Sequence, residues 1–259
     1  MNVWRHRALL YSFISREVRA RYLGSRVGVF WALIHPLLLL GMYALVFRSI
    51  FKVSIPELGE RSFVEFVAVA LWPWLAFQEG VQRGLHAIAA NAPLVKKVAF
   101  PHELLVYGAV CGTYLVHLAG YAVVLSILAL FGTGLSFVGT LLVLPLLLLL
   151  MLLSIGLALP LAALQTLARD TDQFMGPIFT LLFYGTPILY SLSSIPDWLR
   201  GAMAFNPLLY FVQPIRDLLF TGHHAVNGMT LLVWFTVPLL FVGGLAFFRR
   251  LSPHFEDFL

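Results

Sequence analysis

Six apolar stretches divide the chain, and they are the feature that most limits what it can fold into. They cover residues 27–47, 63–77, 104–131, 137–167, 174–192 and 229–248. A helix needs about 20 such residues to cross the hydrocarbon core of a bilayer. Charged residues make up only 11% of the 259 residues, whereas a soluble domain carries about 25%. The chain is therefore predicted to be an all-α integral membrane protein with six transmembrane helices in residues 27–259.

Lysine and arginine residues fall mostly on one side of the predicted membrane. Six crossings place both termini on the same side, and that side carries twelve of the 17 basic residues. Basic segments are retained in the cytoplasm, so both termini are predicted to be cytoplasmic. The net charge of +5 then reflects topology and contact with anionic lipid, and no nucleic acid partner is expected.

Residues 1–26 precede the first apolar stretch and are predicted to form an amphipathic helix in the cytoplasmic interface. At helical spacing, Phe13 and Val18 lie on an apolar face and Arg16 and Arg19 lie opposite. Such a helix can be a lipid anchor that orients the first span, or it can also be a surface for a cytosolic partner. The sequence leaves both interpretations open.

The outer segment, residues 193–224, is neither polar like a loop nor long enough to cross twice. Pro196, Pro207 and Pro214 divide it into apolar pieces of roughly ten residues. These pieces are predicted to form short interfacial or re-entrant helices. Because backbone at membrane depth must lie against protein or water, we expect this segment near the mouth of a pathway.

Several kinds of chemistry are missing from the sequence. None of the three lysines follows a glycine, so the phosphate-binding loop GxxxxGK[ST] is absent and the chain is not expected to hydrolyse ATP alone. No metal-ligating pattern such as HExxH occurs, and we predict no metal site, no cofactor and no catalytic residue in this chain. The acidic residues lie at the ends of the spans or between them, which argues against ion-coupled transport.

Aromatic residues follow the first and fifth spans and form the candidate substrate pathway. These residues are Trp31, Tyr43, Phe47 and Phe51 in or after the first span and Tyr184 and Tyr190 in the fifth. Such stripes usually pack helices together or meet lipid headgroups. The functional alternative is a surface on which the apolar faces of sugar rings slide.

Paired glycines at GxxxG spacing are typical of helices that approach each other closely. Gly80 and Gly84 form one pair, and Gly108 and Gly112 another. Six closely packed helices leave little room for a wide pore. A wide pathway would therefore need a second copy of the chain.

The stretch Ala92 to Pro101, APLVKKVAFP, resembles a cytoplasmic connection of ABC-2 type permeases that is close to N-x-x-L-[VI]-x-[KR]-x-x-F-P. Further matches are Arg169-Asp170 with Gln173, Asn206-Pro207 followed by Arg216, and Arg16-Glu17-x-Arg19-x-Arg21 leading to Trp31. The resemblance covers essentially the whole chain. Within the family, the chain looks most like the permease subunits that export O antigen, capsular or teichoic polysaccharides.

The resemblance implies a homodimer joined to two ATPase subunits that bind ATP and Mg. The substrate would be an undecaprenyl-diphosphate-linked glycan, and the location the bacterial inner membrane. Residues 91–101 would form the coupling segment, with Leu94, Val95, Lys96, Lys97, Phe100 and Pro101 against the ATPase. Lys96 and Lys97 could pair with acidic ATPase residues or only enforce topology.

Three arginines remain open to two interpretations. Arg16, Arg19 and Arg21 could receive the lipid diphosphate, or they could contact anionic phospholipids. Two other functions also remain open for the chain as a whole. One is an ABC-2 exporter of drugs or lipids, and the other, in a different class, is a membrane-embedded enzyme that modifies lipids or glycans.

Overall fold

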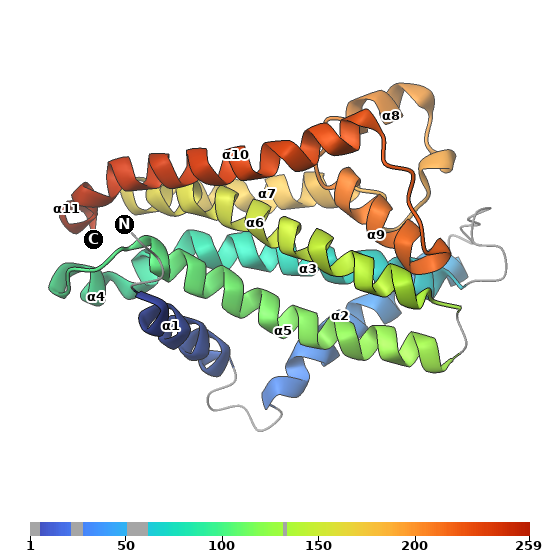
Figure 1. Ribbon diagram of the computed structural model, residues 1–259, viewed down its shortest axis with the longest axis horizontal. Coiled ribbons are helices and arrows are strands. Elements are labelled where there is room, and N and C mark those ends of the chain that lie inside the picture. Colours follow the sequence, from blue (N-terminus) through green and yellow to red (C-terminus); the bar gives the residue numbers. More distant parts are fainter. Residues whose placement is uncertain (1–5, 22–27, 51–61, 132–133) are drawn as a thin grey trace.

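The computed structural model describes residues 6–21, 28–50, 62–131 and 134–259, and within these ranges it is helical without β-strands. The helices are α1 (Arg7–Ala20), α2 (Trp31–Tyr43), α3 (Phe63–His86), α4 (Ala92–Lys97), α5 (Glu103–Leu130), α6 (Phe137–Leu167), α7 (Thr171–Tyr184), α8 (Asp197–Met203), α9 (Leu209–Thr221), α10 (Gly228–Leu251) and α11 (Phe255–Phe258). Helices α3, α5, α6 and α10 run along the long axis of the molecule (Figure 1). Helices α1, α4 and α11 lie toward one end, and α8 and α9 lie toward the other.

Three helices among the described residues are long and apolar enough to cross a membrane. They are Glu103–Leu130, Phe137–Leu167 and Gly228–Phe258, and they correspond to the third, fourth and sixth predicted spans. A shorter apolar helix, Leu33–Phe47, corresponds to the first. The chain is thus an all-helical, multi-pass membrane protein, while six crossings remain a prediction.

Helix α3 is the central helix of the bundle and is longer than its apolar stretch predicts. It starts with Ser62 as its N-cap: the Ser62 hydroxyl accepts a hydrogen bond from the Glu65 amide and donates one to the Glu65 carboxylate. It then continues past Phe77 to His86 because its polar residues pair with neighbouring helices. Gln82, for example, donates to Asp172 in α7 at 2.6 Å. Pairing removes the cost of burying these side chains.

Helix α7 ends at Tyr184, eight residues before the end of the predicted fifth span. Gly185 caps the helix and Pro187 follows, so the helical hydrogen bonds cannot continue. The side chain of Asn206 donates to the carbonyl oxygen of Gly185 at 2.9 Å. The buried Arg216 side chain donates to the carbonyl oxygen of Pro187 at 2.8 Å. The outer segment therefore satisfies the backbone groups that α7 leaves open.

Glycines set the distances between the long helices. A Cβ atom at Gly84 would lie 2.6 Å from Cβ of Ala158 in α6, and one at Gly80 would lie 3.1 Å from the Tyr114 ring in α5. A Cβ atom at Gly156 in α6 would lie 3.0 Å from the backbone nitrogen of Phe241 in α10. Because α3, α5, α6 and α10 approach at positions without side chains, their interfaces are closely packed.

The outer segment contains two short helices, as the sequence predicts. Helix α8 has 7 residues and α9 has 13, so neither is long enough to cross a bilayer. The inner face of α9, including Phe211 and Ile215, is fully buried, and α9 packs on α3 and α6. Gly222 ends α9 with a φ of 78°, a left-handed conformation that glycine adopts without strain.

Candidate coupling element and translocation site

The coupling segment, residues 91–101, forms an exposed end of the molecule built around α4. Val95 is buried and anchors α4, whereas Lys96, Lys97 and Val98 are exposed. The Val98 backbone is extended, which ends the helix and leads the chain back to α5. This arrangement presents two cations and an apolar side chain on one short, exposed projection.

Helix α1 holds the base of the coupling segment. Arg16 donates to the Asn91 side chain at 2.6 Å, and Asn91 donates to the Ala87 carbonyl oxygen at 2.8 Å. The ring of Phe13 packs on that of Phe100, with centroids 5.8 Å apart. Both ends of the segment therefore contact α1.

Helix α1 in turn is seated on α5 at the Gly108/Gly112 pair. A Cβ atom at Gly108 would lie 2.7 Å from Cβ of Phe13, and one at Gly112 would lie 2.9 Å from Cγ of Glu17. The helices can meet this closely only because these positions lack side chains. The GxxxG spacing thus marks the seat of the N-terminal helix, a role that the sequence alone does not distinguish from packing among spans.

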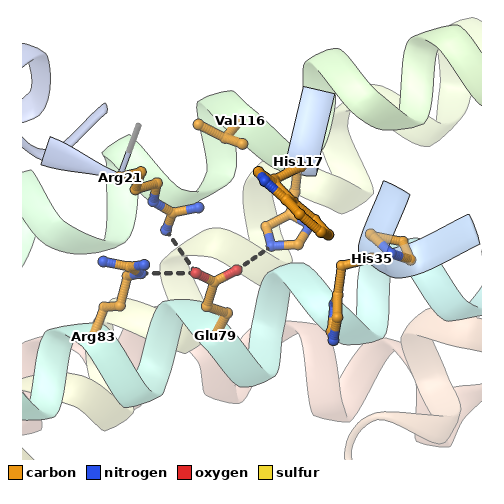
Figure 2. Close-up of a pocket in the computed structure, with 8 residues that line it drawn as sticks. Arg21, His35, Glu79, Arg83, Val116 and His117 are labelled. Carbon is orange, nitrogen blue, oxygen red and sulfur yellow. Dashed lines mark hydrogen bonds and ion pairs between the residues drawn. The ribbon is translucent and has the colours of Figure 1, made fainter. Parts of the chain in front are cut away.

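A charged cluster ties α1, α3 and α5 together beside a cavity of about 200 Å³ (Figure 2). Glu79 of α3 is at its centre and pairs with Arg83 at 2.7 Å, His117 at 2.7 Å and Arg21 at 3.1 Å. Arg83 also reaches Glu17 at 2.8 Å. Because two guanidinium groups face two carboxylates, their formal charges balance within the cluster.

The walls of this cavity bring further polar groups together. Trp31 and His35 come from the start of α2, and His117 comes from α5. Nε2 of His117 faces Glu79, while its buried Nδ1 has no hydrogen-bond partner among the described residues. His117 therefore joins α5 to Glu79 of α3 through one ring nitrogen.

A second cavity, of about 240 Å³, lies among aromatic side chains of α2, α3 and α7. Tyr43 stacks on Phe183 with centroids 5.8 Å apart, and Trp74 approaches Phe183 to 5.5 Å. Tyr184 and Gln78 also line the cavity. Besides the rings, the lining holds three leucines, the Gln78 amide and the Thr180 hydroxyl. The cavity therefore combines ring faces, which suit the apolar faces of sugars, with hydrogen-bonding groups.

Comparisons with known proteins identify the family. Residues 8–220 match the ABC-2 type transporter family. The chain belongs to this family. The match covers most of the chain, so the family predicted from the coupling segment and the flanking motifs is confirmed.

Three relatives match this ABC-2 chain over most of their lengths. An O-antigen export system permease protein RfbA of Klebsiella pneumoniae is 28% identical over 97% of this chain and 95% of its own. A Myxococcus xanthus protein with the same description is 31% identical over 84% and 82%. The polysialic acid transport protein KpsM of Escherichia coli is 27% identical over 90% of each.

The predicted pathway residues of the ABC-2 chain only partly come together. Tyr43 and Tyr184 line the aromatic cavity, Phe47 packs on Tyr43, and the Tyr190 hydroxyl donates to the Tyr184 carbonyl oxygen. Trp31 instead lines the charged cavity. Phe51 lies outside the described residues. Trp74 and Phe183 also line the cavity. Phe183 belongs to the aromatic stripe of the fifth span, whereas Trp74 comes from the second span, for which the sequence predicts no pathway.

The predicted diphosphate-binding arginines have different surroundings. Arg21 pairs with Glu17 and Glu79 and donates to Thr113 at 2.5 Å. Arg16 donates a hydrogen bond to the Asn91 side chain, and Arg19 is exposed. The arginines therefore do not form one cluster: Arg21 contributes to helix packing and Arg16 to the base of the coupling segment.

Proposed function

We propose that this chain is the membrane subunit of an ATP-driven exporter that moves a lipid-linked polysaccharide of the O-antigen type across the bacterial inner membrane. In this proposal two copies join two ATPase subunits, which bind ATP and Mg. The substrate is an undecaprenyl-diphosphate-linked glycan. The chain supplies the pathway and receives mechanical work from the ATPases.

The observation that carries the proposal is the near full-length match to permeases whose names specify O-antigen export. A relative named for polysialic acid transport extends the substrates of such relatives to another polysaccharide. The long apolar helices agree with a membrane subunit. The exposed projection formed by α4 agrees with docking to a soluble partner.

The proposed orientation places α1, α4 and α11 in the cytoplasm and the outer segment on the far side. Two observations support this orientation. Basic residues concentrate in the segments that include α4 and the two termini, and these helices lie toward one end of the molecule, with α8 and α9 toward the other (Figure 1). Helix α1 then lies at the cytoplasmic interface, and the apolar stretches cross the membrane six times.

The proposed mechanism starts where the ATPase closes on α4. Displacement of α4 reaches α1 through Phe13 and Arg16, and α1 transmits this displacement to the charged cluster on α3 and α5. Helix α3 carries both Glu79 of that cluster and Trp74 of the aromatic cavity. Movement of α3 therefore changes the surface that the glycan meets. A ring surface holds sugars by their apolar faces, with little demand for fixed hydrogen bonds, so the polymer can slide.

The lipid diphosphate is proposed to meet the arginines in and just after the last turn of α1. A diphosphate can form charge-assisted hydrogen bonds with guanidinium groups. Binding at Arg21 would require the diphosphate to displace Glu17 and Glu79, whereas exposed Arg19 needs no such exchange. We therefore assign first contact with the diphosphate to Arg19.

The coupling assignment is tested by replacing Phe100 and Pro101 with alanine in cells. We expect normal membrane insertion and loss of glycan from the cell surface, because the contact with Phe13 is removed. Phe131→Ala, at the exposed opposite end of α5, is the matched control and should leave export unchanged. Full surface glycan in the double variant would remove the assignment.

A further inference from the structure

Five aromatic side chains form a continuous chain of contacts at the cytoplasmic end of the proposed exporter. We call Phe13, Phe100, His102, Phe255 and Phe248 the aromatic chain. Successive ring centroids lie 5.8, 5.2, 6.2 and 5.2 Å apart. These separations fall within the range of favourable ring contacts. The aromatic chain begins in α1, passes through the coupling segment, and ends in α10.

Phe255 is the link from the C-terminal segment, residues 252–259, to the rest of the aromatic chain. Its side chain is fully buried between His102 and Phe248, although α11 itself has only four residues. Helix α11 contacts both α4 and α6. By contrast, Phe258 in the same helix is 52% exposed. The C-terminal segment is thus docked through Phe255.

The surroundings of His102 suit a packing role for its ring. Burial lowers the pKa of His102, against the opposing effects of Glu103 and Glu256. The lowered pKa favours the neutral imidazole, which packs between two phenyl rings without the cost of burying a charge. Beside it, Arg249 of α10 pairs with the buried Glu103 at 2.8 Å. This ion pair fixes the end of α10 against the start of α5.

Helix α10 connects this end of the molecule to the outer segment. It runs along the long axis and packs closely on α6 (Figure 1). Near its other end, Trp234 donates a hydrogen bond to the carbonyl oxygen of Tyr210 in α9 at 2.9 Å. Close-packed interiors transmit displacement because they contain little free volume. A shift of Phe248 therefore acts on a helix that holds α9.

We infer that the C-terminal segment works together with the coupling segment. Phe255 is a positioning residue that transmits displacement of the coupling segment to α10. The inference rests on the proposed function. It adds a connection from α4 to the outer segment through α10, alongside the connection from α4 to α3 through α1. Removing Phe255 should leave ATPase docking intact, because the exposed face of α4 is unchanged.

The test measures ATP hydrolysis and glycan export by the full complex in proteoliposomes. Phe255→Ala should keep at least about half of the ATP hydrolysis and lower the glycan exported per ATP by roughly tenfold, as a loss of about 1.4 kcal/mol of coupling would. Phe258→Ala is the matched control in the same helix and should keep the wild-type ratio. An unchanged ratio in Phe255→Ala would overturn the inference.

Replacements of His102 distinguish transmission from folding if Phe255→Ala assembles poorly. His102→Phe keeps a ring between Phe100 and Phe255 and should keep the wild-type ratio of glycan to ATP. His102→Ala breaks the aromatic chain and should lower that ratio at normal complex yield. Equal ratios in both variants would overturn the inference. If the wild-type complex hydrolyses ATP without exporting glycan, the proposed function itself fails.

Discussion

Glu79 shows how single residues join separate helices in this protein. Its carboxylate pairs with Arg83 of its own helix, with Arg21 just after α1, and with His117 of α5. The side chain of Arg21 is only 6% exposed, so its charge depends on these partners. Removing one partner of a buried or half-buried ion pair leaves the other charge poorly solvated.

We expect Glu79→Gln to destabilise the purified protein by about 1–3 kcal/mol, the cost of leaving a partly buried charged group unpaired. The midpoint of thermal unfolding in detergent should fall by at least about 3 °C. Asp197→Asn is the control, because Asp197 pairs with Arg200 but its side chain is 95% exposed. A decrease of the same size in both variants would contradict the role of the cluster.

Replacing Phe183 tests whether the aromatic cavity takes part in glycan export. It contacts Tyr43, Trp74 and Tyr184, and Phe183→Ala should slow glycan export roughly three- to tenfold, since ring contacts are worth about 0.5–1.5 kcal/mol. The rate is measured from surface glycan after induction, with complex yield unchanged. Phe235→Ala, on an exposed part of α10, is the control and should export normally. Equal slowing in the two variants would contradict a role of Phe183 in export beyond helix packing.

At the scale of elements, apolar runs predict where the long helices lie but not where polar residues are tolerated within them. The predicted bounds of the fourth span coincide with α6, and those of the third nearly coincide with α5. Helix α3 extends beyond its apolar run because Glu79 and Gln82 find partners on other helices. Those partners are distant in sequence, so neither the helix end nor the charged cavity could be predicted from local pattern.

The seat of α1 on α5 is tested with a bulky residue at Gly108. Gly108→Leu should push α1 away, because even a Cβ atom at that position collides with Phe13; overpacking costs about 1–3 kcal/mol. Trypsin should then cut at Arg16 and Arg19 roughly tenfold faster, since cleavage follows the population of the open form. Gly176→Leu is the control, because no atom lies within 4 Å of a Cβ atom there. Unchanged cleavage in Gly108→Leu would contradict the seating of α1.

At the scale of the whole molecule, composition and charge predict a multi-pass, all-helical protein, and the family resemblance adds its place in an exporter. The aromatic residues of the first and fifth spans partly converge, as Tyr43 and Tyr184 show, because α2 and α7 both pack against α3. Trp31 lies at the start of α2 and therefore lines the charged cavity instead. Spacing along a sequence gives the face of a helix but not the neighbour it meets.

The proposed topology is tested by labelling single cysteines in intact cells, after Cys111 is replaced by serine. A cysteine in place of Asp197 should react with an impermeant reagent from outside. One in place of Lys97 should react only after the membrane is opened, because the basic coupling segment is retained in the cytoplasm. The reverse pattern would contradict the orientation derived from the basic residues.

The most direct test of the central claim is transport in proteoliposomes that contain this chain with or without its partner ATPase. With ATPase, ATP and Mg, we expect an undecaprenyl-diphosphate-linked glycan added on the ATPase side to reach the opposite side. The chain alone should move none, because it lacks a phosphate-binding loop. Equal movement of the glycan by the chain alone would contradict the account.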